Sequence, residues 1–290
     1  MDLGRVGVWT SAFRMLEPDT RPAAVRELEG LGYGAIWFPG GAPDGAFAHA
    51  RDLLEASERL VVATGIVSVW SATAEVVAAA NRSLRADHPD RFLLGLGISH
   101  PEGVNRQAPG TYRRPLATMV EYLDALDRLD PDGRPGQRAL AALGPKMLAL
   151  SAARTAGAHP YFVPVEHTAF ARAELGGGAL LVPEQMVLVE TDPERARAIA
   201  RQHMAVYLGL VNYTSNLRRF GYGDDDFAGG GSDRLVDAIV AWGDAETVAE
   251  RVRAHLDAGA DQVCLQVLTE DRTELPMAAW RTLAEILDLA

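Results

Sequence analysis

The chain has 290 residues, which is the length of one α/β barrel domain. Hydrophobic residues make up 48% of it, enough for a sizeable core. Lys and Arg number 28 and Asp and Glu number 39, so the formal net charge is −11. Such an acidic chain is a poor general partner for nucleic acid or an anionic membrane, and the charge favours a small-molecule partner. An ordinary acidic protein surface accounts for the same charge.

Short apolar runs alternate with longer helical patterns, an order typical of βαβ units and a parallel sheet. The expected strands cover residues 5–9, 34–38, 60–67, 92–98, 139–143, 161–163, 186–190 and 261–268. The expected helices cover about 20–31, 73–86, 115–129 and 276–287, and a further helix starts at Pro145. These elements predict a (β/α)8 TIM barrel as a single domain over residues 1–290. An insertion at about 192–245 separates strands seven and eight.

Cys264 is the only cysteine, so no disulfide can form within the chain, and a cytoplasmic location is expected. It lies in the apolar run Val263–Leu265 and is expected to be a core residue rather than a reactive thiol. Residues 1–5 carry no signal-peptide pattern. No apolar stretch reaches about 20 residues, so no membrane-spanning helix is expected.

In this architecture, functional groups collect in the loops that follow the strands. His100 and His167 follow expected strands, and a functional and a structural role are weighted equally for both. His49 lies near the expected start of a helix and stays open as a candidate. Structural or surface roles are expected for the other histidines, which are His88, His159, His203 and His255.

The chain contains no His-x-His, Cys-x-x-Cys, nucleophile elbow or phosphate-binding Walker loop, so no metal site is expected. Gly95-Leu96-Gly97 begins like a dinucleotide fingerprint but lacks the third glycine. The segment Gly144-Pro145-Lys146 is more informative. A helix that starts at proline presents free backbone N–H groups to an anion, and glycine permits close approach. An ordinary helix start without a ligand is the alternative.

Two segments, Thr64–Val67 and Asp90–Gly97, resemble the luciferase-like monooxygenase superfamily, and the likeness covers nearly the whole chain. Longer strings are similar to its branch of coenzyme F420-dependent oxidoreductases. These strings are Leu140–Met147, Gly157–Tyr161, Asn212–Arg219 and Gly230–Arg234.

The resemblance implies a luciferase-like barrel with a cofactor ring over its strand ends and a non-prolyl cis peptide bond at Gly65-Ile66. It also implies an inserted lid and a homodimer. The cofactor-binding residues so implied are Gly65, Ile66, Gly97, Ser99, Gly144, Pro145, Lys146, Val163 and His167. The residues implied for the lid or substrate are Asn212, Tyr213, Asn216 and Arg218.

The loop after the second strand departs from the family pattern. Gly40 stands where an acidic or histidine-bearing loop is usual, and a general acid or base contributes roughly 100-fold or more to rate. The candidate catalytic residues are therefore His100, with Asp44 or His49 as substitutes for the missing group.

The leading hypothesis is an F420-dependent oxidoreductase that transfers a hydride between the coenzyme and a small organic substrate. The first alternative is an FMN-dependent luciferase-like monooxygenase. The second is a cofactor-binding barrel whose catalysis is lost or altered, and the Gly40 loop is the feature that supports it.

Overall fold

The computed structural model describes residues 1–41, 43–133, 135–271 and 274–290, with the side chains of Pro43 and Asp44 left out. Its strands form one parallel sheet in the order β10-β9-β11-β1-β2-β3-β5-β6-β7-β8, with β4 beside β5. The strands are β1 (Val6–Trp9), β2 (Ala35–Phe38), β3 (Val61–Thr64), β4 (Val67–Ser68), β5 (Phe92–Gly97), β6 (Arg138–Leu140), β7 (Gly157–Ala158), β8 (Leu180–Leu181), β9 (Glu184–Val189), β10 (Val240–Gly243) and β11 (Val263–Val267).

The two ends of this sheet meet through β8 and β9, which are consecutive along the chain. On one side, the N–H groups of Val182 and Glu184 donate to the carbonyls of β7 and its continuation at 2.9 Å. On the other side, the carbonyls of Leu181 and Pro183 accept from the N–H groups of Asp261, just before β11, and Cys264 within it, also at 2.9 Å. Residues 180–184 therefore join β7 to β11, and because β11 also pairs with β1, the expected (β/α)8 barrel is confirmed.

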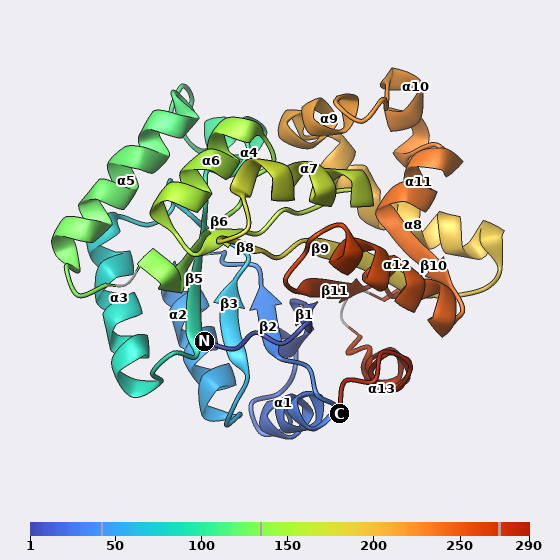
Figure 1. The fold of residues 1–290 in the computed structure, drawn as a ribbon, viewed down its shortest axis with the longest axis horizontal. Coiled ribbons are helices and arrows are strands. Elements are labelled where there is room, and N and C mark those ends of the chain that lie inside the picture. Colours follow the sequence, from blue (N-terminus) through green and yellow to red (C-terminus); the bar gives the residue numbers. More distant parts are fainter. Residues whose placement is uncertain (42, 134, 272–273) are drawn as a thin grey trace.

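Helices surround the strands (Figure 1). The α-helices are α1 (Arg21–Gly30), α2 (Pro43–Glu55), α3 (Ala74–Asp87), α4 (Pro101–Gln107), α5 (Pro115–Leu129), α6 (Pro145–Arg154), α7 (Val165–Leu175), α8 (Pro193–Leu208), α9 (Val211–Arg218), α10 (Asp224–Phe227), α11 (Asp233–Ile239), α12 (Ala245–Asp257) and α13 (Met277–Ile286). Short 3-10 turns are η1 (Ala12–Arg14), η2 (Pro135–Gln137) and η3 (Ala228–Gly230). No helix of the described residues is long and apolar enough to span a bilayer.

Strand periodicity divides the core into two layers. Along β2, Ala35 and Trp37 belong to a cluster that also draws residues from β3, β5, β6 and β11, which can meet only inside the barrel. Ile36 and Phe38 belong to the larger cluster between the sheet and the outer helices. Successive side chains of a strand point to opposite faces, so one strand serves both layers.

Two expected strands are placed differently in the structure. The third barrel strand is divided into β3 and β4, and the peptide bond Gly65-Ile66 between them is cis. The sixth is β7 at Gly157–Ala158, so the expectation of a strand at 161–163 was wrong. That apolar run is a turn instead, and Phe162 has a φ of 59°, outside the β region.

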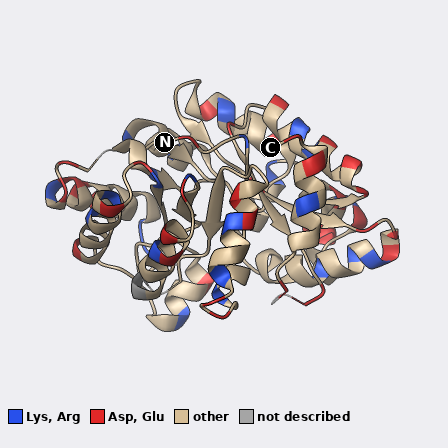
Figure 2. Cartoon of the chain, turned by 90° about the horizontal axis from the view of Figure 1, so that it is seen from below, with Lys and Arg blue, Asp and Glu red and all other residues tan. Residues whose placement is uncertain are grey.

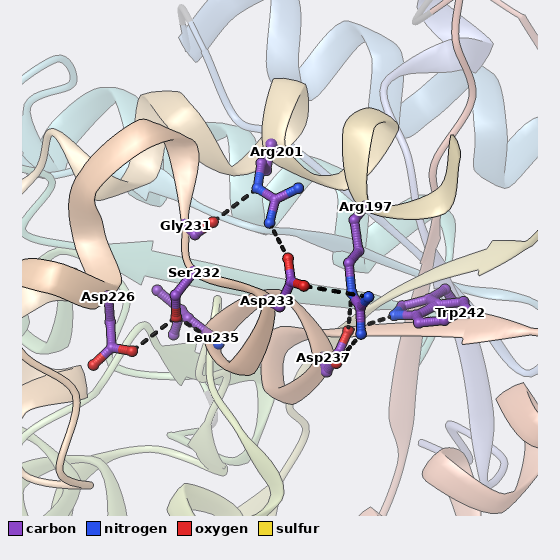
Figure 3. Close-up of polar contacts among 9 residues, drawn as sticks. All are labelled: Arg197, Arg201, Asp226, Gly231, Ser232, Asp233, Leu235, Asp237 and Trp242. Atoms are coloured by element: carbon purple, nitrogen blue, oxygen red, sulfur yellow. Dashed lines mark hydrogen bonds and ion pairs between the residues drawn. The ribbon is translucent and has the colours of Figure 1, made fainter. Parts of the chain in front are cut away.

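The expected insertion is present between β9 and α12 and contains α8 to α11 together with β10, a strand that its sequence does not reveal. Charged side chains bind these pieces to one another (Figure 3). Arg197 of α8 pairs with Asp237 of α11 at 2.6 Å, and Asp237 also accepts from Trp242 of β10 at 2.8 Å. Arg201 pairs with Asp233. The insertion therefore has its own polar framework around its apolar cluster.

Candidate active site

A cavity of about 800 Å³ opens at the carboxyl ends of the barrel strands. Its wall consists of Trp9 at the end of β1, the loops after β2, β3, β5, β6 and β7, and the helix α9 with Tyr207 of α8. In barrels of this kind, this end carries the chemistry. Ten of the residues expected from the sequence line the cavity, namely Gly65, Ile66, Ser99, His100, Gly144, Pro145, Lys146, Asn212, Tyr213 and Asn216.

The floor of the cavity is the peptide between Gly65 and Ile66, which is cis, as the resemblance implies. The side chain of Ile66 lies over Gly97, where an added Cβ would come within 2.6 Å of Ile66 Cγ1. Gly97 therefore does not line the cavity. The absence of its side chain leaves room for Ile66, which does.

Two ring nitrogens lie behind Gly65. A Cβ at Gly65 would stand 2.7 Å from Trp9 Nε1 and 3.2 Å from His159 Nε2, and both nitrogens are buried without a hydrogen-bond partner. His159 Nδ1 lies 2.7 Å from the Val182 carbonyl, which assigns the ring proton to Nδ1. Burial lowers the pKa of His159 to about 4, so the ring is neutral near pH 7 and its Nε2 is an acceptor.

Gly40 makes a close backbone contact. A Cβ there would lie 2.7 Å from the carbonyl carbon of Ile66 and 2.9 Å from the Cα of Val67. No side chain fits unless one of the two segments moves. The close packing of Gly40 against the floor of the cavity therefore excludes the acidic side chain that the family pattern predicts at position 40.

The opposite end of the cavity is the N-terminus of α6. Gly144 is its N-cap residue, Pro145 its first residue, and Lys146 is exposed in its first turn. Lys146 is the only lysine of the chain. Charges of both signs are spread over the helices and loops of the chain (Figure 2). The described lining of the cavity, in contrast, carries Lys146 and Arg219 and no carboxylate. This end of the cavity therefore favours an anion.

Val163 and His167, which were expected to bind cofactor, are buried behind the wall rather than part of it. His167 Nε2 lies 3.0 Å from the carbonyl of Leu143, the residue before Gly144. Burial lowers the pKa of His167 to about 4, so the ring is neutral and can donate its Nε2–H to that carbonyl. His167 therefore stabilises the loop that precedes α6 and does not itself line the cavity.

His100 lies at the rim, beside the inserted helix. Its ring is 4.7 Å from that of Tyr213, and its Nδ1 is buried without a partner. Burial lowers the pKa of His100, and the neighbouring Glu102 partly opposes the shift. Asn212 Nδ2 donates to the carbonyl of Ser99 at 3.0 Å, which ties α9 to the loop after β5.

Two other expected residues, Arg218 and His49, do not line this cavity. Arg218 pairs with Asp224 and lies over the ring of Phe227 at 5.0 Å. His49 is in the middle of α2, buried, and lines a separate pocket behind Gly40. The side chain of Asp44 lies outside the described residues.

The sequence analysis missed several polar groups near the cavity. Tyr161 donates to Gln266 Oε1 at 2.7 Å, and its oxygen lies 2.7 Å from that of Tyr207. Glu184 is buried below them; its Oε2 accepts from the N–H of Phe162 at 3.1 Å, while its Oε1 has no partner. Burial raises the pKa of Glu184 to about 8. A correct placement of the sixth strand at 157–158 would have put His159 and Tyr161 after it, at the functional end.

The structure thus combines a barrel, a cis peptide bond at the end of its third strand and a cavity over its strand ends. Residues 5–262 match the model of the luciferase-like monooxygenase family, and the chain belongs to that family. Among curated protein sequences, no match is found.

Solved structures with the same fold are similar over nearly their whole length. One is an F420-dependent secondary alcohol dehydrogenase in complex with an F420-acetone adduct, with 14% identity, a TM-score of 0.73 and 99% of both chains covered. Another is the coenzyme F420 dependent tetrahydromethanopterin reductase from Methanopyrus kandleri, with 13% identity, a TM-score of 0.72 and coverage of 98% and 99%. A third is the FMN-bound oxygenating constituent of 3,6-diketocamphane monooxygenase from Pseudomonas putida, with 13% identity, a TM-score of 0.65 and coverage of 98% and 97%.

Proposed function

We propose that this luciferase-like chain is an oxidoreductase that uses coenzyme F420 to transfer a hydride to or from a small organic substrate. The observation that carries the proposal is the shape of the cavity. Its floor at Gly65-Ile66 suits a flat ring, and its far end at Gly144-Pro145-Lys146 suits a phosphate.

The residues present fit a cofactor of this class. Gly65 adds no side chain to the floor, and Gly97 leaves the space in which the Ile66 side chain lies. At the far end, Asn216 lines the cavity with its amide nitrogen and oxygen buried and unpartnered, so both can form hydrogen bonds with a polar side chain of the cofactor. When bound, the coenzyme would supply the hydride acceptor or donor.

The chain itself binds, orients and excludes water. Tyr161 and Tyr213 form an aromatic wall with Trp9, and burial holds the pKa of both tyrosines well above the ordinary value, so they stay neutral. His100 is the proposed catalytic residue, a neutral ring at the rim that can accept or return a proton at a substrate oxygen. His49 is not proposed for this step, because it lines a separate pocket, and the side chain of Asp44 lies outside the described residues.

An FMN-dependent monooxygenase is the second candidate, and the charge of the cavity favours it. Lys146 and Arg219 are two cations, which match the two negative charges of a phosphate monoester such as FMN. The phosphate of F420 is a diester with a single charge. A barrel that binds a cofactor without turnover is the third candidate, favoured by the absence of a carboxylate from the described lining.

Fluorescence titrations of the purified protein with F420 and with FMN separate these candidates. Tight binding of F420, followed by a change in its absorbance with a substrate alcohol or ketone, supports the leading proposal. Tight binding of FMN alone overturns it in favour of the monooxygenase. Binding without turnover over a broad substrate panel supports the third candidate, and binding of neither cofactor rejects all three.

Homodimer formation, which the resemblance implies, and a cytoplasmic location, which the single cysteine leads us to expect, belong to this proposal. Sedimentation of the purified chain at several concentrations tests the first, and fractionation of expressing cells tests the second. A monomer at all concentrations, or recovery outside the cytoplasm, would remove these parts and leave the cofactor proposal intact.

A further inference from the structure

A second cavity, termed the arginine pocket below, adjoins the candidate active site at Gly40. Its volume is about 410 Å³, and Gly40 is the one residue that the described linings of both cavities share. The charged and titratable residues of its lining are Arg14 from η1, Arg21 from the start of α1, and His49 and Asp52 from α2. No step of the proposed hydride transfer uses them.

Arg14 brings an uncompensated positive charge to this pocket. Its Nη2 donates to the carbonyl of Gly40 at 3.3 Å, and its guanidinium lies 5.0 Å from the centre of the Phe38 ring. Burial lowers the pKa of Arg14, and among the described residues no carboxylate opposes that shift or pairs with it. A guanidinium stays charged and carries five N–H donors, so most of the donors of Arg14 remain available to a ligand.

Arg21, in contrast, is already held in place. It donates to the carbonyls of Phe13 at 2.9 Å and of Leu16 at 3.3 Å, and it pairs with Asp52 at 2.6 Å. Asp52 is the only carboxylate of the described lining, and this ion pair uses it. The described lining therefore has two guanidiniums and one carboxylate, an excess of positive charge that favours an anion.

His49 is the third basic group of the pocket. It is 5% exposed, and its Nε2 is buried without a hydrogen-bond partner, although buried polar atoms normally have one. Burial, together with the charges of Arg14 and Arg21, lowers the pKa of His49 to about 3, so the ring is neutral near pH 7. A neutral ring carries one N–H, and an anion in the pocket would give it an acceptor while offsetting the guanidinium charge.

We propose that the arginine pocket binds a small oxyanion, a carboxylate or a phosphate, held by the guanidinium of Arg14 and the Nε2–H of His49. The planar guanidinium matches two oxygens of such an anion, and Arg21 adds a second, fixed positive charge. The site is separate from the N-terminus of α6, because the described linings of the two cavities share only Gly40. It requires neither the cofactor nor hydride transfer, and therefore goes beyond the proposed function.

Modification of arginine side chains by phenylglyoxal, mapped by mass spectrometry on peptides of the unaltered chain, tests this site. The rate at Arg14 is measured in sodium phosphate, in sodium acetate and in sodium chloride of the same ionic strength. At an anion concentration about ten times its Kd, competition is expected to slow modification of Arg14 about tenfold. The exposed Arg26 of α1 is the matched control, and its rate is expected to stay unchanged.

The two salts distinguish the ligand class. Protection of Arg14 by acetate alone assigns a carboxylate ligand, protection by phosphate alone assigns a phosphate, and protection by both assigns a general oxyanion site. No slowing at Arg14 by either salt, or equal slowing at Arg26, overturns the site.

Two variants locate the anion. Lys146→Ala removes the cation at α6 and is expected to keep the protection of Arg14; loss of protection would place the anion in the other cavity and overturn the proposal. His49→Leu removes the N–H and is expected to weaken the protection. Because Nε2 has no partner, this variant should be at least as stable as the parent chain in urea denaturation. Unchanged protection in His49→Leu would overturn the assignment of His49.

Discussion

The side chain of Ile66 occupies the space that a side chain on Gly97 would need. A Cβ at Gly97 would lie 2.5 Å from Ile66 Cδ1, so the two positions cannot both carry side chains without movement. Ile66 lines the cavity beside Gly65, and the place of its side chain therefore depends on the absence of a side chain at Gly97, on the neighbouring strand β5.

Replacing Gly97 with alanine is expected to push Ile66 into the cavity. Overpacking of this kind costs about 1–3 kcal/mol of the free energy of unfolding. We also expect weaker binding of the ring cofactor, measured by fluorescence titration beside urea denaturation. Gly30→Ala is the control, because a Cβ there meets nothing within 4 Å. Unchanged affinity and stability in Gly97→Ala would show that the floor adapts freely.

Placing an acid at residue 40 is expected to harm the protein rather than supply the missing catalytic group. The Cβ of Gly40→Asp would press on the backbone of Ile66 and Val67, so both stability and cofactor affinity should fall. The matched variant is Gly45→Asp, whose Cβ lies in open space. A Gly40→Asp chain that folds normally and gains activity would contradict this account.

Glu184 is expected to make stability fall as pH rises through the neutral range. Its pKa is about 8 in the folded chain, well above that of a free carboxyl, so between these values the folded state holds a proton that the unfolded state has lost. That contribution is complete below the unfolded pKa and disappears as pH passes 8, with a slope of up to about 1.4 kcal/mol per pH unit.

The variant Glu184→Gln isolates this effect, because it keeps the shape and removes the titration. Relative to the parent chain, it should gain stability steadily from pH 5 to pH 8 in urea denaturation. The pKa values of buried His159 and His167 are lowered to about 4, so these residues make stability fall as pH decreases below 6.5. Both proteins contain them, so their effect cancels in the difference. A pH-independent difference between the two chains would show that Glu184 titrates normally.

Replacing Lys146 with alanine is expected to weaken binding of a phosphate-bearing cofactor about tenfold, the value of one charge-assisted contact near a helix N-terminus. Lys146→Arg should retain most of the affinity, since it keeps the charge. Riboflavin, which has no phosphate, should bind all three proteins alike. The assignment fails if FMN and F420 bind Lys146→Ala as tightly as they bind the parent chain.

Local signals predicted much of the fold and part of the site. Pro145 was expected to start a helix after Gly144, and it does. Proline suits this position because the N–H groups of the first helical turn have no partner within the helix, so the missing N–H costs nothing. The sixth strand was misplaced because it is two residues long and small, Gly157–Ala158, while the more strand-like run at 161–163 forms the turn after it.

The contacts of single side chains were harder to predict from the sequence. Arg218 and Arg219 are neighbours with the same chemistry, yet one pairs with Asp224 and the other faces Gly144. Where each guanidinium points depends on how α9 packs, which no local pattern encodes. Glu184 likewise begins an ordinary-looking strand, and only closure of the barrel buries it.

The solitary lysine at the mouth of the cavity has a practical consequence. The other 27 basic residues are arginines, so apart from the amino terminus the chain presents one primary amine to a reagent. An amine-directed dye therefore labels the protein at the edge of this cavity. Coupling to a solid support through side-chain amines would, for the same reason, anchor every molecule with that entrance against the surface.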